Sequence, residues 1–163
     1  MVEVDLIKEL VEGRIVSIKQ DEANQKEKLN ALVEMKQKSV SNFETLSNKI
    51  STLTSLYADV IQKSGDRVMF YQSKDAKNSD DKARSFIDIL FFPIGHDVEK
   101  YGYNTPLIEF ELIPEQGKLN ISQRVSRTPA PLSPVTELDV NSDNCYELSA
   151  QHLSNFLKGV LKK

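Results

Sequence analysis

Hydrophobic residues recur with a period of 3.5 along the N-terminal part of the chain. If heptad position d is assigned to Val4 and to every seventh residue after it, twelve of the seventeen a and d positions up to Val60 are apolar. This spacing places the apolar side chains in one seam along a helix, and a seam of that length needs a second helix to cover it. We therefore predict a coiled-coil oligomerisation helix over residues 1–65.

The predicted seam contains both apolar and polar positions. Polar a and d residues cost stability but specify partner and register, so a homodimer and a heterodimer both stay open. The alternative is a helix that folds back on its own domain, which a length of roughly 90 Å disfavours for most of it. The polar positions are Lys8, Glu22, Gln25, Lys36 and Ser39. Besides Val4, the apolar seam residues are Val11, Ile15, Ile18, Leu29, Leu32, Phe43, Leu46, Ile50, Leu53, Tyr57 and Val60.

One continuous helix is the favoured interpretation of this segment. Residues 3–63 contain no proline and a single glycine, Gly13. A polar stretch over residues 20–28 offers a place for a break, but the heptad register is the same on both sides of it. Gly65 suits the left-handed position that follows the last turn of a helix, so we place the helix end there.

After Gly65 the pattern changes to the alternation of β-strands, with aromatic and β-branched residues. A helix with one apolar face then closes the chain, and Asn144 with Glu147 is predicted to form its capping box. The expected fold class is α+β: the long coiled-coil helix, then a small head over residues 66–163 made of an antiparallel β-meander covered by the C-terminal helix. The predicted strands are 67–72, 84–92, 107–113 and 118–125, with a turn at Pro114–Gly117 and a short extended piece at 138–140; the helix is 145–161.

Composition and charge add few constraints. The chain has 163 residues and a net charge of −3, which gives no general field for binding nucleic acid. The first residues lack the basic and apolar stretches of a signal peptide, and no apolar run is long enough for a membrane span. We expect an intracellular protein of nucleus or cytoplasm without a membrane partner. The single cysteine cannot form an internal disulfide.

Candidate chemical groups are few, and each has a structural interpretation that we prefer. His96 and Asp97 could do acid–base work, but a solvated loop is favoured. Cys145 begins a helix, which can lower a thiol pKa, but a semi-buried structural thiol is favoured. Glu109 and Glu111 share one strand face, for which a solvated outer face is favoured. No zinc-site spacing or phosphate-binding glycine motif occurs, so we expect no catalytic residue, cofactor or metal.

Late in the chain, basic residues form a candidate docking face for an acidic protein partner. The docking residues are Arg124, Arg127, Lys158, Lys162 and Lys163.

The head contains the stretches RSFIDILFF, PLIEFEL and KLNISQRV, and it ends in LSNFLKGVLKK. With these stretches after a long coiled coil, the chain resembles the small coiled-coil subunits of eukaryotic kinetochore complexes, including the monopolin subunit, whose heads are of the RWD type.

The resemblance implies a protein-binding module without catalytic residues, and a role in chromosome segregation. The sequence therefore predicts a non-enzymatic structural or adaptor subunit that oligomerises through its helix and docks a protein through its head. The competing interpretation is an enzyme or ligand-binding domain with an appended oligomerisation helix, or a bacterial or phage accessory protein of similar layout.

Overall fold

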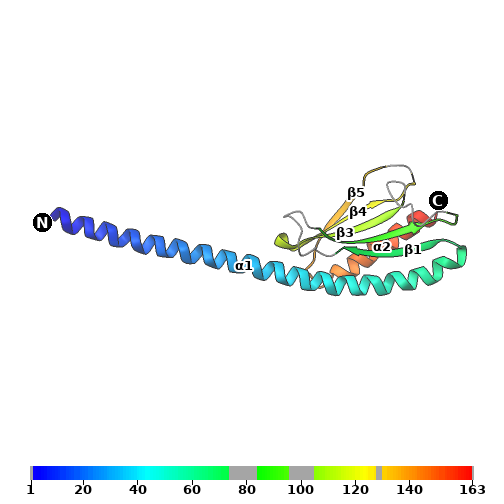
Figure 1. Cartoon of the computed structure of the whole chain (residues 1–163), viewed down its shortest axis with the longest axis horizontal. Coiled ribbons are helices and arrows are strands. Elements are labelled where there is room, and N and C mark those ends of the chain that lie inside the picture. The colour runs from blue at the N-terminus through cyan, green and yellow to red at the C-terminus, as the bar shows by residue number, and fades with distance from the viewer. Residues whose placement is uncertain (1, 74–83, 96–104, 128–129, 163) are drawn as a thin grey trace.

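A computed structural model describes residues 2–73, 84–95, 105–127 and 130–162. The 60-residue helix α1 (Val2–Ile61) dominates the shape, because its N-terminal half projects away from the head while its C-terminal half lies along the sheet (Figure 1). A five-stranded sheet and the helix α2 (Cys145–Leu161) complete the head. The expected α+β layout is confirmed.

Helix α1 is unbroken, as the constant heptad register predicted. A short 3₁₀ turn, η1 (Gln62–Ser64), follows it, and Gly65 ends the helix with a φ of 88°. A Cβ at Gly65 would lie 2.6 Å from the terminal methyl of Ile94, an exposed side chain that could move aside, so the left-handed backbone is the reason for glycine here. The Oδ1 of Asp66 accepts a hydrogen bond from the backbone N–H of Ile94, which ties the helix end to the end of β2.

The sheet is an antiparallel meander in which each strand pairs with the next along the chain. Four strands match their predicted positions closely. The fifth is longer than the predicted piece at 138–140, because Pro134 is tolerated on an edge strand beside a register shift at Ile121/Ser122. The strands are β1 (Arg67–Ser73), β2 (Ser85–Phe92), β3 (Leu107–Ile113), β4 (Lys118–Arg124) and β5 (Ser133–Asp139), with η3 (Pro114–Gln116) between β3 and β4.

The main core lies between one face of the sheet and the two helices. Alternate residues of the central strands point into it, which is why β3 reads apolar at Ile108, Phe110 and Leu112. From α2, Leu153 and Phe156 pack against this face. Leu161, in the last turn of α2, is 47% exposed and lies outside this core.

Helix α1 supplies the other half of the cover, and this corrects the predicted division at residue 65. Phe43, Leu46 and Ile50 are buried in the same core as the strands, so the globular unit is not confined to residues 66–163. The physical reason is width: five strands present more apolar surface than the single apolar stripe of α2 can cover.

The start of α2 differs from the predicted capping box. Asn144 makes no capping hydrogen bond with its side chain; its Oδ1 accepts a hydrogen bond from the Ser142 hydroxyl at 2.6 Å instead. Cys145 is buried at this helix start, and burial raises the pKa of its thiol. This agrees with the structural interpretation of the cysteine, because a raised pKa disfavours the reactive thiolate.

Candidate interaction surfaces

The projecting half of α1 carries a row of exposed apolar side chains. In the predicted seam these are Val11, Ile15, Ile18, Leu29 and Leu32, which are between 46% and 61% exposed. Isolated helices gain little stability from propensity alone and depend on burial of an apolar face. An exposed apolar stripe of this length is therefore a candidate interface. Further exposed apolar residues on this half are Val4, Leu6, Ile7, Leu10, Val16, Val33 and Met35.

The predicted seam divides in two near Ser39. Before it the seam is exposed; after it the same heptad positions face the chain's own head. Phe43, Leu46 and Ile50 are buried there, so their assignment to an oligomer seam is wrong. Leu53 and Tyr57 are partly buried against the same core, and Val60, at 65% exposed, belongs to neither surface.

Near Ser39, where the seam passes from exposed to buried, small polar residues let α1 approach the head closely. Ser39 is fully buried, and its hydroxyl donates a hydrogen bond to the carbonyl of Met35 at 2.7 Å. Asn141 donates from its Nδ2 to the Ser39 Oγ at 3.2 Å and accepts from the Asn42 Nδ2 at 2.8 Å. Ser39 was predicted to specify a partner chain, whereas it joins α1 to the loop before α2. A Cβ on Gly117 would meet Met35 Sδ at 3.0 Å, which shows how closely the turn approaches the helix.

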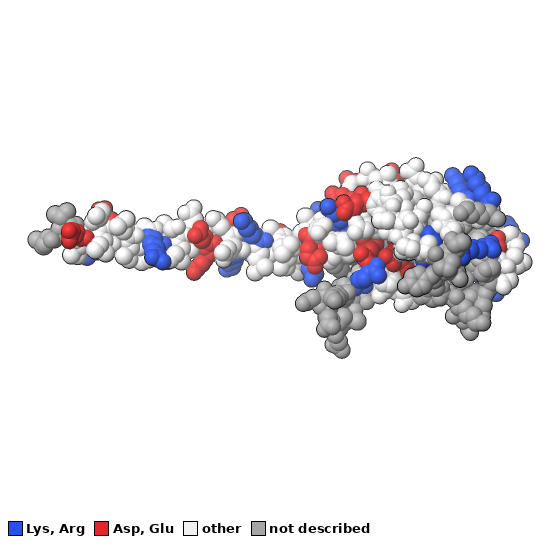
Figure 2. All heavy atoms as spheres, turned by 90° about the horizontal axis from the view of Figure 1, so that it is seen from above, with Lys and Arg blue, Asp and Glu red and all other residues white. Residues whose placement is uncertain are grey.

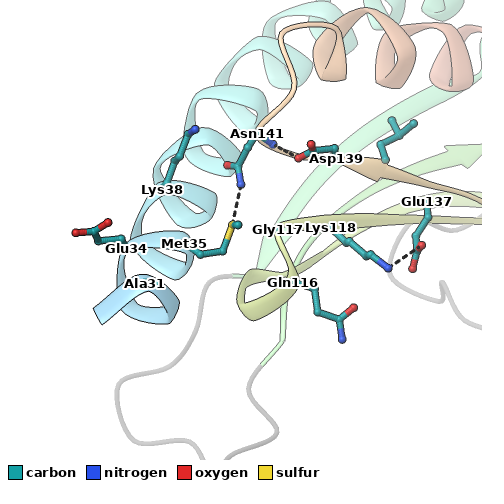
Figure 3. Close-up of a pocket in the computed structure, with 11 residues that line it drawn as sticks. Ala31, Glu34, Met35, Lys38, Gln116, Gly117, Lys118, Glu137, Asp139 and Asn141 are labelled. Carbon is teal, nitrogen blue, oxygen red and sulfur yellow. Dashed lines mark hydrogen bonds and ion pairs between the residues drawn. The ribbon is translucent and has the colours of Figure 1, made fainter. Parts of the chain in front are cut away.

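A hollow of about 700 Å³ lies beside this junction, between α1 and the β4–β5 end of the sheet (Figure 3). Its lining has both charges: Lys118 forms an ion pair with Glu137 at 3.3 Å, and Lys38 lies across from them on the helix. The Nδ2 of Asn141 points toward Met35 Sδ at 3.3 Å. The described lining residues carry both charges and include no nucleophile and no unpaired buried charge. A hollow with such a lining suits contact with solvent or with a polar stretch of polypeptide.

The predicted docking face is only partly assembled. Arg124 is 7% exposed, and its guanidinium donates hydrogen bonds to the carbonyls of Thr105, at 2.9 and 3.1 Å, and Ala130, at 2.7 Å. This residue holds two connecting segments together, so the prediction that it docks a partner is wrong. Arg127, Lys158 and Lys162 are exposed, as docking requires, and Lys163 lies outside the described residues. Figure 2 shows basic side chains gathered at the end of the head far from the helix tip.

The sheet face away from the helices carries a carboxylate cluster. Arg84 bridges the carboxylates of Glu109, at 2.7 Å, and Glu111, so the expected fully solvated face is wrong for this pair. Asp88, directly opposite Glu109 in the strand register, is only 8% exposed. Burial, followed by the charge and hydrogen bond of Glu109, raises the pKa of Asp88 to about 8.

Among the described residues, the carboxylates of this cluster do not have the arrangement that a metal ion requires. Within the described ranges, no group of three or more His, Cys, Asp or Glu side chains is arranged to hold a metal ion. Leu90, Phe92 and Leu107 form a small apolar cluster nearby with Leu132, so this part of the face is packed. His96 and Asp97 lie outside the described residues.

The sequence could not reveal Asp88, Arg84 and Arg124 as functional or structural groups, because their partners are distant in the chain. Alternation does place Asp88 on the face of Glu109 once the strand register is known.

Among the described residues, no helix has the length and apolar character that crossing a membrane requires. Comparison with known proteins finds no family model, no curated protein and no solved structure that matches this chain.

Proposed function

We propose that this protein is a structural subunit that assembles with another chain through residues 4–32 of α1 and presents its head at a distance from the junction. The observation that carries the proposal is the exposed apolar seam on the projecting half of α1. Apolar a and d residues left in water destabilise a helix, and pairing with a second helix removes them from it.

The form of the molecule supports a scaffold role. The head keeps its core within one chain, since Phe43, Leu46 and Ile50 complete it. Assembly through the projecting helix therefore leaves the head intact and spaces it from the junction (Figure 1). The exposed basic residues Arg127, Lys158 and Lys162 are the part of the head that we propose for docking an acidic protein surface. A kinetochore role stays a prediction from the resemblance, and a nuclear or cytoplasmic location stays a prediction from the sequence.

The test is sedimentation of three chains over a range of concentrations. The unmodified chain should sediment as an elongated oligomer, and Ile15→Asp/Ile18→Asp should sediment as a monomer, because each aspartate would bury an unpaired charge. Ser17→Asp/Gln20→Asp is the matched control, since it adds the same two charges to the same part of the helix at exposed positions outside the seam. Equal behaviour of the double variant and the unmodified chain would contradict the proposal.

Docking by the head has a separate test. Charge reversal of Lys158 and Lys162 should weaken capture of an acidic test peptide such as a poly-glutamate, and salt should weaken the remaining binding. Lys49→Glu, which reverses a charge elsewhere on the head, is the control. Equal peptide affinity in all three proteins would remove the basic docking face.

A further inference from the structure

Charge is distributed unequally along the projecting part of α1. Residues 3–12 contain four acidic residues and one basic residue, a net charge of −3. Residues 26–38 contain four basic residues and two acidic residues, a net charge of +2. All of these side chains are exposed, and acidic atoms mark the far tip of the helix in Figure 2. Two copies of this helix attract each other most when the tip of one lies against the head-proximal end of the other.

From this distribution and the seam we infer that α1 pairs with α1 of a second copy in antiparallel orientation, with Ile15 of each chain opposite Ile18 of the other. The inference rests on the proposed function and names its partner, orientation and register. In this register Val4 also lies opposite Leu29 of the second copy, so four apolar layers form by two-fold symmetry. Lys8 meets Gln25 of the second copy and Val11 meets Glu22, each pairing twice by the same symmetry, so the other four of the eight layers contain polar residues.

The flanking positions of this register are complementary. In an antiparallel pair, e positions face e positions and g positions face g positions, and charges there set orientation and partner. The e positions bring Asp5 to Lys26 of the second copy and Glu12 to Lys19. The g positions bring Arg14 to Asp21. Each pair is opposite in charge, and each occurs twice in a symmetric dimer.

Neighbouring antiparallel registers lack this complementarity. A slide of one heptad toward more overlap places Lys19 against Lys19 and Arg14 against Lys28 of the second copy. A slide of one heptad the other way places Glu12 against Glu12 and Arg14 against Arg14. Like charges at such positions destabilise the pairing, so charge selects one register.

A parallel, in-register pair meets two obstacles. It stacks Lys8 on Lys8 and Glu22 on Glu22 at core positions, where like charges are costly. It also brings both heads to the same level, and each head already occupies the seam face from Ser39 onward, where Phe43 and Leu46 are buried. The antiparallel pair avoids this collision, because its overlap ends at Leu29, before the head begins, and the two heads lie at opposite ends.

A charge-swap cycle on the dissociation constant of the full chain tests the orientation. Arg14→Glu alone and Asp21→Lys alone should each weaken the dimer by about tenfold, because each turns two attractive pairs into repulsive ones. The double variant should recover most of the affinity. In a parallel pair Arg14 instead faces Lys19 of the partner, so Arg14→Glu would tighten the dimer. An unchanged or tighter Arg14→Glu dimer therefore overturns the inference.

A distance measurement separates failure of this inference from failure of the proposed function. A spin label at Asn30, in a Cys145→Ala background whose mass and helicity match the unmodified chain, reports the distance between the two copies. The antiparallel register predicts roughly 40 Å between labelled positions, at 1.5 Å rise per residue. A parallel pair predicts a distance near the helix separation of about 10 Å, which would overturn the orientation only. A monomeric chain without dipolar coupling would overturn the proposed function as well.

Discussion

At the scale of single residues, the buried carboxyl of Asp88 couples its ionisation to folding. Its pKa is raised to about 8 by burial and by neighbouring Glu109, from an ordinary value of 3.8. Between these two values the folded chain holds a proton that the unfolded chain has released. The resulting stabilisation is complete below about pH 4 and is lost as pH rises through about 8.

We predict that Asp88→Asn removes this pH dependence. The free energy of unfolding of the unmodified head should fall between pH 5 and pH 8, by up to about 1.4 kcal/mol per pH unit from this group. The asparagine variant should lack this fall in stability with rising pH. At pH 8 it should therefore be more stable than the unmodified chain. Urea unfolding at several pH values measures this, in the Ile15→Asp/Ile18→Asp background so that assembly does not contribute.

The matched control is Asp59→Asn on the exposed surface of α1. It should leave the pH profile unchanged. If Asp88→Asn has the same profile as this control, Asp88 is not the proton-linked group of the fold.

At the scale of elements, α1 is one helix whose two halves have different surroundings. Ile15 and Ile50 occupy the same heptad position, yet Ile15 is 47% exposed and Ile50 is fully buried under the sheet. The sequence predicted the helix and its continuity, together with nearly every strand, because periodicity determines these. It could not show where the apolar seam passes from exposed to buried, since the apolar pattern is the same whether the covering surface belongs to the same chain or to another.

The same limit explains Arg124. Its partners are the backbone carbonyls of Thr105 and Ala130, and any residue supplies such a carbonyl. No sequence pattern therefore distinguishes it from Arg127, which remains exposed. Tertiary contacts of this kind become visible only when the strand order and connections are known.

A pair of equal substitutions tests the two roles of α1. Ile50→Ala should lower the free energy of unfolding of the head by about 2–5 kcal/mol, because it opens a cavity in a packed core. Ile15→Ala should leave the unfolding of the head unchanged at dilute, monomeric concentration and should instead weaken assembly. Chemical unfolding of the head, followed by its tyrosine fluorescence, and sedimentation measure the two effects. Equal loss of head stability in both variants would contradict this division.

At the scale of the whole molecule, the structure combines a head whose core lies within one chain with a projecting half of α1 whose apolar residues are exposed. A chain that begins at residue 66 should fail to fold, since it lacks Phe43, Leu46 and Ile50 and leaves one face of the sheet open to water. A chain that begins at Val33 keeps these residues and the Ser39–Asn141 contact, so it should fold as a monomer. Circular dichroism and amide exchange of the two truncated chains check this. A well-folded 66–163 fragment would show that α1 is dispensable for the core.

The molar mass of the unmodified chain in solution tests the central claim most directly, that the projecting half of α1 is an assembly surface. Light scattering across a concentration series should give twice the 18.5 kDa mass of the chain at high concentration, with dissociation on dilution. The chain that begins at Val33 should have the mass of one copy throughout, because it lacks the seam. A full-length chain that keeps the mass of a single copy at hundreds of micromolar would contradict the account.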